Sequence, residues 1–138
     1  MKRLRRPLIL TLYLSFVLAA CGGGTDSPSK SINVTLTDFQ FTPNTFAVPT
    51  GATISFTGVN NGADEHSFAI MKLGHEIKTR FTDADRPNIY WLVPAIEPGQ
   101  TITDSFTAPS QPGTYQILCI HQGHFEAGMI ARLIVVAP

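Results

Sequence analysis

Short runs in which apolar and polar residues alternate recur along the chain after residue 31, separated by Pro, Gly and Asn. Alternation with a period of two is typical of β-strands that bury one face. No run in this part of the chain shows the period of an amphipathic helix of ordinary length. The segments expected to be strands are Asn33–Thr37, Thr45–Val48, Thr53–Asn60, Ser67–Met71, Thr101–Thr107, Gly113–Cys119 and Met129–Val136.

Turn-forming sequences divide these segments, and most of them combine Gly with Pro or Asn. The clearest are Pro49-Thr50-Gly51, Asn60-Asn61-Gly62, Glu97-Pro98-Gly99 and Gln111-Pro112-Gly113. Short strands at this density predict an all-β fold. We expect one antiparallel Greek-key sandwich or barrel of about seven to eight strands.

Residues 72–95 interrupt the pattern. Lys72–Arg80 has a mixed sequence that is compatible with one helical turn, and Asp83–Asn88 is expected to be a loop. A connection of this length in a compact domain usually has structure or a task of its own. We expect a surface excursion that caps one end of the barrel, with partner docking as the alternative, and we expect Tyr90 and Trp91 to be packing residues.

The first residues have the pattern of a secretory signal. Four basic residues lie among the first six positions, and an almost unbroken apolar run, Leu8–Leu18, follows. Because a membrane span needs about 20 apolar residues, this run indicates a signal peptide instead. The sequence Leu-Ala-Ala-Cys at 18–21 resembles a bacterial lipobox. The resemblance implies that residues 1–20 are removed and that Cys21 carries a lipid.

Two alternatives to lipidation stay open: ordinary cleavage that leaves Cys21 as a free thiol, and a retained transmembrane anchor. In the preferred interpretation, residues 21–31 form a polar, Gly- and Ser-rich linker. One domain follows at 32–138. The protein would then be extracytoplasmic, periplasmic or at the cell surface, and held to a bacterial membrane by its N-terminal lipid.

The formal net charge of zero hides an imbalance. Four of the ten basic residues lie in the expected signal, so residues 21–138 carry six basic and ten acidic residues, a net charge of −4. This balance argues against a basic patch that binds nucleic acid or anionic lipid.

The chain has two cysteines, Cys21 and Cys119. In an oxidising, extracytoplasmic setting a disulfide between them would be possible. If Cys21 is lipidated, its sulfur is a thioether and this disulfide cannot form. Cys119 is then a single free thiol, and coordination of a metal would explain its presence.

Cys119, His124 and Met129 follow one another at five-residue intervals, and His66 lies upstream at the start of a predicted strand. Strands that end at the same end of a sandwich would bring these residues together. Taken singly, each has an ordinary structural explanation: a buried thiol, a hydrogen-bonded imidazole or a core thioether. Together, two imidazoles, a thiolate and a weakly bound thioether are the donor set of an electron-transfer copper site.

The Cys-x4-His-x4-Met spacing, followed by an alternating strand at 130–136, resembles that of the cupredoxins, the small blue copper proteins. The resemblance covers residues 32–137 and is strongest to azurin-, auracyanin- and rusticyanin-type members. It implies a cupredoxin-like sandwich with one type 1 copper ion. His66, Cys119 and His124 would be the equatorial ligands of this ion, and Met129 would be its axial ligand.

The resemblance also suggests which groups surround the ion. The backbone N–H groups of Ser67 and His121 are candidate donors to the Cys119 sulfur, and the ring of His124 is the expected electron port. Gln122 stands where many members of the family have proline. Two histidines, His75 and His121, are not among the predicted ligands. His75 lies in the long loop and is expected to be solvated, whereas an accessory role for the side chain of His121 stays open.

The predicted function is therefore that of a monomeric, membrane-tethered one-electron carrier that is not an enzyme, with redox proteins as its electron donor and acceptor. A multicopper oxidase would need histidines on both sides of the ligand cysteine, but here the neighbours are Leu118 and Ile120. Two other functions stay open: a carrier or chaperone lipoprotein that delivers copper to an oxidase, and a metal-free adhesion module.

Overall fold

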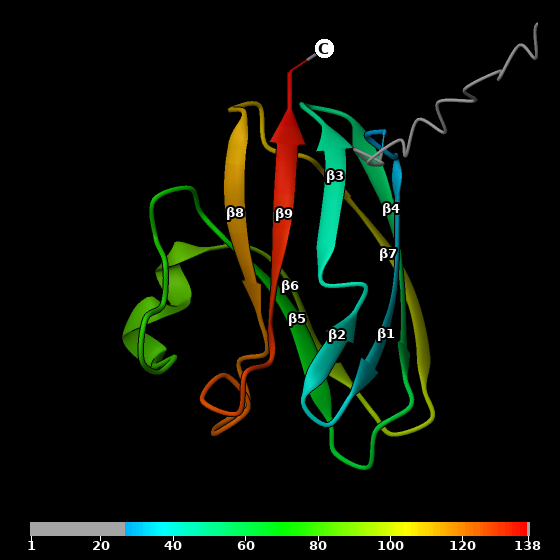
Figure 1. Cartoon of the computed structure of the whole chain (residues 1–138), viewed down its shortest axis with the longest axis vertical. Helices are drawn as coiled ribbons and strands as arrows, with labels where there is room; N and C mark the ends of the chain where they lie inside the picture. The colour runs from blue at the N-terminus through cyan, green and yellow to red at the C-terminus, as the bar shows by residue number, and fades with distance from the viewer. Residues whose placement is uncertain (1–26, 138) are drawn as a thin grey trace, which may run out of the picture.

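The structure is a computed structural model that describes residues 27–137. The expected signal at 1–20 and the lipidation site Cys21 lie outside the described residues. The chain folds into a sandwich of a four-stranded sheet, in the order β2-β1-β4-β7, and a five-stranded sheet, in the order β3-β9-β8-β5-β6 (Figure 1). The strands are β1 Ser31–Thr37, β2 Gln40–Thr42, β3 Thr45–Pro49, β4 Thr53–Asn60, β5 His66–Met71, β6 Ile89–Ile96, β7 Thr101–Thr107, β8 Gly113–Leu118 and β9 Ile130–Val136.

The all-β sandwich is confirmed, and each segment expected to be a strand coincides with one to within two residues at either end. The described residues form nine strands rather than seven or eight. The sequence pattern missed β2, which has three residues, and β6, which contains Pro94. Because β6 lies at the edge of its sheet, a residue without a backbone N–H is tolerated there.

The expectation of an antiparallel fold is wrong for two pairs of strands. β1 pairs with β4 in parallel, and β3 pairs with β9 in parallel. A parallel pair needs a long connection between its strands. Here the connection crosses to the other sheet, as the chain does between β1 and β4 when it forms β3. Both sheets are therefore mixed.

The expectations for the helical turn within residues 72–95 are also wrong. A 3₁₀-helix spans Asp83–Asn88, which was expected to be a loop, and no helix forms in Lys72–Arg80. The physical reason lies at its start, where the carboxylate of Asp85 accepts hydrogen bonds from the backbone N–H and the hydroxyl of Thr82, at 2.8 and 2.7 Å. A threonine followed three residues later by an acidic residue is a recognised helix-start signal.

The core lies between the two sheets and is centred on aromatic residues. The ring centroid of Phe68 lies 4.8 Å from that of Phe56 and 5.4 Å from that of Phe41. Trp91 stacks on Phe106 at 4.6 Å, which confirms its role in packing. Tyr90, by contrast, is 39% exposed.

A second, smaller cluster underlies residues 72–88. Met71, Leu118 and Phe125 are buried there, and Ile77 and Phe81 of the excursion pack against them. Phe125 belongs to the 119–129 segment, so the excursion contacts the segment that carries three of the four candidate ligands. The excursion thus has structure of its own, as its length suggested.

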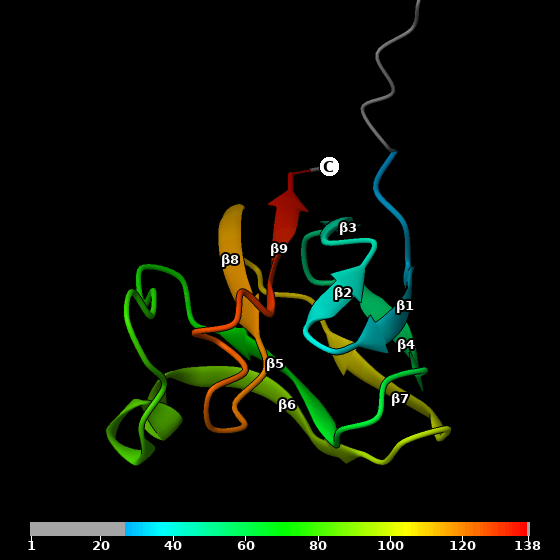
Figure 2. The ribbon, with the colours of Figure 1, turned by 60° about the horizontal axis from the view of Figure 1, so that its bottom comes forward.

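The two ends of the sandwich differ. The turn before β5 and the 119–129 segment gather at one end, whereas the start of β1 and the end of β9 lie at the other (Figure 1). Figure 2 turns the first of these ends forward. The register agrees, because Leu36 pairs with Asn60 near that turn and Ser31 pairs with Ser55 farther away. We call the end with the 119–129 segment the site end.

β-type contacts begin before β1 itself. The backbone N–H of Ser29 donates to the carbonyl of Ala47 at 2.8 Å, within the range 21–31 that was expected to be a linker. Among residues 27–137, no helix is long and apolar enough to cross a membrane.

Candidate metal centre

β5 and β8 hold two of the predicted ligands. His66 is the first residue of β5, and Cys119 directly follows the last residue of β8. These strands pair antiparallel with Ala69 opposite Leu118, which places the start of β5 beside the end of β8. The side chains of His66 and Cys119 are completely buried.

The segment 119–129 holds the other two. The backbone N–H of His124 donates to the carbonyl of His121 at 3.1 Å, and that of Met129 donates to the carbonyl of His124 at 3.0 Å. The segment closes where the N–H of Cys119 donates to the carbonyl of Met129 at 3.2 Å. These bonds hold the loop in a compact shape over the ends of β8 and β9.

Two glycines make this tight loop possible. Gly123 and Gly128 have φ angles of 85° and 98°. Residues with a Cβ rarely adopt these positive angles, because the side chain then crowds the backbone. The tight turns on both sides of His124 therefore depend on glycine.

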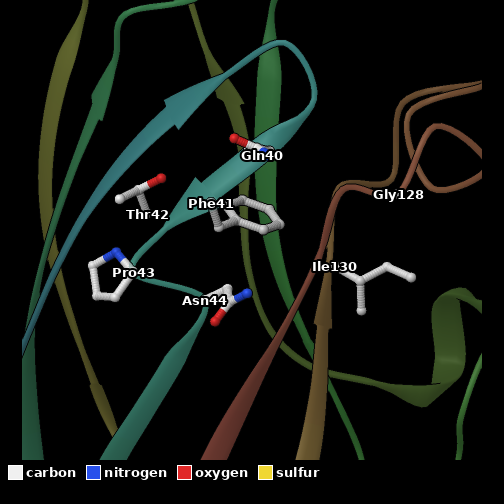
Figure 3. Close-up of a pocket in the computed structure, with 7 residues that line it drawn as sticks. All are labelled: Gln40, Phe41, Thr42, Pro43, Asn44, Gly128 and Ile130. Carbon is white, nitrogen blue, oxygen red and sulfur yellow. The ribbon is translucent and has the colours of Figure 1, made fainter.

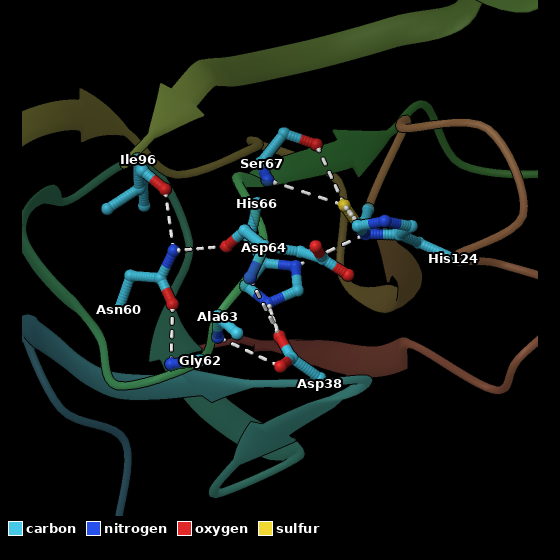
Figure 4. Close-up of polar contacts among 10 residues, drawn as sticks. Asp38, Asn60, Gly62, Ala63, Asp64, His66, Ser67, Ile96 and His124 are labelled. Carbon is cyan, nitrogen blue, oxygen red and sulfur yellow. Dashed lines mark hydrogen bonds and ion pairs between the residues drawn. The ribbon is translucent and has the colours of Figure 1, made fainter. Parts of the chain in front are cut away.

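Three donor atoms converge at the site end. The ring nitrogens and the thiol sulfur of His66, Cys119 and His124 all lie within 4.8 Å of one another. The Nδ1 atoms of the two histidines are 3.2 Å apart, and Nδ1 of His124 lies 3.4 Å from Sγ of Cys119. Figure 4 shows both rings turned toward one point beside the yellow sulfur atom.

Met129 lies next to this cluster through its backbone bonds to Cys119 and His124. Its side chain is completely buried, in the same core cluster as Cys119. This position is compatible with the predicted axial role.

The cluster fits a copper ion. Ligand atoms about 2.0–2.3 Å from one metal lie roughly 3.3–4 Å apart, close to the separations of 3.2 and 3.4 Å seen here. Two imidazole nitrogens and one thiolate form the trigonal set of blue-copper sites, where a thioether is the usual weak fourth ligand. The fold and the donor set therefore both agree with the copper site that the sequence predicted.

Comparison with known protein families supplies the deciding observation. The family described as cupredoxin-like domain matches residues 8–131, which is most of the chain. The chain belongs to the cupredoxin-like family.

Individual relatives agree with this assignment. The protein is 28% identical to auracyanin-A of Chloroflexus aurantiacus, over 98% of this chain and 99% of that one. It is 26% identical to the copper-resistant cuproprotein CopI of Rubrivivax gelatinosus, over 82% of this chain and 70% of that one. The structure of reduced auracyanin from Roseiflexus castenholzii is similar, with 31% identity, a TM-score of 0.69, and coverage of 80% of this chain and 99% of that one.

The sulfur of this cupredoxin accepts two hydrogen bonds from one residue. The backbone N–H and the hydroxyl of Ser67 both lie 3.3 Å from Sγ of Cys119. The sequence predicted the first bond and missed the second. The same hydroxyl oxygen accepts the backbone N–H of Ile120 at 2.8 Å, which fixes its orientation. Ser67 therefore links β5 to the first residues after β8.

Burial changes the proton affinities of the site. The pKa of Cys119 is raised, mainly by desolvation, and the hydrogen bonds from Ser67 and from the backbone of His121 oppose this rise. The pKa of His124 is lowered, again mainly by desolvation, with smaller contributions from His66 and His121. A neutral imidazole is the form that binds metal, whereas the thiol must release its proton when metal enters.

The two imidazoles of the cupredoxin site have different surroundings. His66 has its other ring nitrogen, Nε2, 2.9 Å from a carboxylate oxygen of Asp38. His124 is only partly buried. The ring of Phe39 packs edge-on against it, with centroids 4.7 Å apart. Asp38 and Phe39 lie together in the turn between β1 and β2, and neither was predicted from the sequence to belong to the site.

The other histidines lie outside the converging cluster. Nε2 of His121 is 3.2 Å from a carboxylate oxygen of Glu65, and the ring centroid of His121 is 5.6 Å from that of His124. His75 is exposed, as expected. An accessory role for His121 stays a prediction.

A groove borders the site end on the side of β2. It has a volume of about 380 Å³. Its lining residues are Gln40, Phe41, Thr42, Pro43, Asn44, Gly128 and Ile130 (Figure 3). Gly128 connects this groove to the ligand-bearing segment, but none of the predicted ligands lines it.

Proposed function

We propose that this cupredoxin binds one copper ion and carries single electrons between redox proteins. His66, Cys119 and His124 would be the equatorial ligands, and Met129 the axial one. The observation that carries the proposal is the convergence of three donor atoms within 4.8 Å at the buried end of a cupredoxin-like sandwich. Copper supplies a one-electron couple between its two common oxidation states.

The residues of this chain hold the donors in place before a metal arrives. His66 is the first residue of β5, and Cys119 directly follows β8, the strand that pairs with β5, so a shift of either residue would disturb the end of this pair. Ser67 fixes the sulfur with two hydrogen bonds. A donor set that hardly moves suits both oxidation states, and the cost of reorganisation on electron transfer is therefore small.

His124 is the ligand that connects the centre to the outside. It is partly exposed, whereas His66 and Cys119 are completely buried. The segment that carries it also exposes Ala127. We propose that electrons enter and leave through this imidazole when a partner protein docks at the site end.

Absorption spectroscopy tests the proposal directly. The copper-loaded protein should show an intense thiolate-to-copper band in the visible region, which ascorbate bleaches and an oxidant restores. His75→Ala is the matched control, because it removes an exposed imidazole outside the cluster and should leave the band unchanged. A protein that takes up no copper would refute the proposal.

A second function is favoured by one relative, the copper-resistant cuproprotein CopI. The chain would then carry copper rather than electrons. Copper uptake without the intense band, followed by rapid transfer to a chelator, would support this alternative. The completely buried thiolate and imidazole argue against it, because exchangeable copper is usually held by exposed donors.

We also propose that the protein is not an enzyme. The residues on either side of Cys119 are Leu118 and Ile120, so the ligand cysteine lacks the flanking histidines that connect such a site to a trinuclear copper cluster. A copper-loaded protein that consumed oxygen in the presence of a reductant would contradict this part of the proposal.

The proposed location is extracytoplasmic, with Cys21 lipidated and the protein held to a membrane as a monomer. The support comes from the sequence of the first 21 residues. Cys21→Ser should move the protein from the membrane fraction to the soluble fraction of the cells that express it. Continued recovery with the membranes would count against the lipid.

A further inference from the structure

A chain of hydrogen bonds lies behind His66, on the side that faces away from the candidate metal position (Figure 4). It begins at Asn60, a completely buried polar residue. The amide nitrogen of Asn60 donates to the carbonyls of Asp64 and Ile96, at 2.8 and 2.7 Å. Its amide oxygen accepts the backbone N–H of Gly62 at 2.8 Å. Asn60 therefore sets the shape of the turn that leads into β5.

This turn holds the carboxylate of Asp38. The backbone N–H of Ala63 donates to one carboxylate oxygen at 2.8 Å, and that of Asp64 donates to the other at 3.3 Å. The oxygen near Asp64 also lies 2.9 Å from Nε2 of His66. Asp38 thus connects the turn between β1 and β2 to a candidate ligand 28 positions away in the sequence.

Gly62 leaves space for this contact. A Cβ at this position would overlap the carboxylate of Asp38 and would lie 2.9 Å from Nε2 of His66. Unlike Gly123 and Gly128, Gly62 does not have a positive φ angle. The reason for a glycine here is therefore the close approach of the backbone to the pair formed by Asp38 and His66, not the conformation of the backbone.

The chemistry of the pair fixes the proton on the ring. An ionised carboxylate only accepts hydrogen bonds, so Nε2 of His66 must carry the hydrogen in this contact. The neutral ring then has its lone pair on Nδ1, which is the atom that faces His124 at 3.2 Å. A carboxylate that holds the outer nitrogen of a ligating histidine fixes its tautomer and orientation and increases its strength as a donor.

We propose that Asp38 is the positioning residue of the metal centre, with Gly62 and Asn60 as the parts of the turn that hold it against His66. The inference rests on the proposed copper function. Asp38 keeps Nδ1 of His66 directed at the ion and favours the more positively charged oxidation state through its negative charge. A purely structural role, in which Asp38 only ties the β1–β2 turn to the turn before β5, is the alternative to exclude.

The test compares Asp38→Asn and Asp38→Ala with Asp64→Asn in the copper-loaded full chain. Asp64 lies in the same turn, and its replacement removes one negative charge without removing the contact to Nε2 of His66. We expect Asp38→Ala to weaken Cu(II) binding by about 10–100-fold and to raise the reduction potential. Asp38→Asn should weaken Cu(II) binding and raise the reduction potential by smaller amounts. The Cu(II) affinity of Asp64→Asn should stay within about twofold of that of the unchanged protein.

A direct readout of the ring separates positioning from structure. In the Cu(I) form, nitrogen-15 NMR should show the Nε2 proton of His66 protected from exchange with water. Asp38→Ala should abolish this protection, and Asp64→Asn should leave it. The Asp38 variants could instead lower the melting temperature and still match Asp64→Asn in copper affinity, in reduction potential and in the protection of the Nε2 proton of His66. The positioning role would then be wrong.

Gly62→Ala provides a second route to the same contact without changing a charge. Like Asp38→Ala, it should weaken copper binding and reduce the protection of the Nε2 proton of His66 from exchange. Gly51→Ala is the control, because Gly51 has open space around its Cα and a φ angle of 63°, so the substitution strains the backbone far from the site. Equal copper affinities for the two glycine variants would overturn the proposal.

Failure of the inference and failure of the proposed function are distinguishable. If the unchanged protein forms no visible copper–thiolate band, the copper function itself is refuted. If it forms the band and the Asp38 variants match Asp64→Asn in every measurement, only the role of Asp38 is refuted.

Discussion

The two histidines of the site end belong to two differently built regions. His66 begins a strand, is completely buried, and contacts Asp38 through its outer nitrogen. His124 lies in a loop between two glycines with positive φ angles, is partly exposed, and packs against the ring of Phe39. The strand side, which holds His66, fixes the geometry of the centre. The loop side, which holds His124, gives the centre access to its surroundings.

Because of this difference, one centre can meet two requirements. Ligands must stay in place when the charge of the ion changes, and at least one of them must be within reach of a partner. A sandwich supplies the first through paired strands and the second through a loop at its end. Variants that remove or alter one side at a time should therefore have different effects on the copper-loaded protein.

Cys119→Ser should remove the centre altogether, because the thiolate is the ligand that the two sides share. The visible band of the copper-loaded protein should disappear. The substitution is nearly isosteric, so far-ultraviolet circular dichroism should still show a folded β-sandwich. A variant that remained blue would refute the assignment of Cys119 as a ligand.

His66→Gly and His124→Gly should both lose the native band, but only one should respond to added imidazole. His124 is partly exposed, so free imidazole can reach the gap that it leaves and restore a thiolate-to-copper band. His66 is completely buried beneath the turn that holds Asp38, so its gap is closed to the added ligand. A titration followed by absorption spectroscopy measures the difference. Equal rescue of both variants would contradict the division into a buried and an accessible side.

Met129→Leu alters the loop side, since the backbone N–H of Met129 donates to the carbonyl of His124. Loss of a sulfur donor that stabilises Cu(II) should raise the reduction potential while copper stays bound. A tenfold to hundredfold loss of preference for Cu(II) corresponds to about 60–120 mV. A redox titration checks this, and an unchanged potential would mean that Met129 is not the axial ligand.

Ser67→Ala alters the strand side and should shift the potential in the opposite direction. The hydroxyl that donates to the sulfur of Cys119 is lost, so the thiolate donates more strongly to Cu(II) and the potential falls. A change of about three- to tenfold in the preference for the two oxidation states corresponds to roughly 30–60 mV. The matched control is Ser105→Ala, at an exposed position of β7, which should leave the potential unchanged.

Arg80→Gln should have the smallest effect. Arg80 of the 72–88 excursion forms an ion pair with Glu126 of the ligand-bearing segment at 3.2 Å, and the two side chains are 68% and 36% exposed. Exposed pairs of this kind contribute less than about 1 kcal/mol to the free energy of unfolding. Urea denaturation should show a loss within this limit. A large shift of the reduction potential would mean that the excursion, and not only the strands, fixes the loop side.

The sequence predicted the residues that gather at the site end because their chemistry is conspicuous. Cysteine, histidine and methionine at five-residue spacing are rare together, and an alternating strand after them indicates where they lie. It also predicted most strands, since each has one buried face. These signals depend on residues close together in the chain, which is why they can be read without a structure.

The groups around the ligands depend on contacts between distant segments. Asp38 contacts His66 because the turn after β1 lies beside the turn before β5. In a sequence, an aspartate at such a position indicates only that a turn forms there. The hydroxyl of Ser67 depends on how β5 and β8 pair. The parallel pairs were missed for the same reason, because alternation reveals a strand but not the direction of its neighbour.

The direction of β1 has a consequence for any attachment made through the residues that precede it. β1 starts at the end of the sandwich opposite His124 and has seven residues, which at about 3.3 Å per residue extend roughly 20 Å. A surface that holds the chain by its N-terminal segment therefore meets the domain at its far end. The partly exposed imidazole of His124 then faces the aqueous side, where it is accessible to soluble redox proteins. To place it against the supporting surface, the N-terminal segment must double back along the full height of the domain.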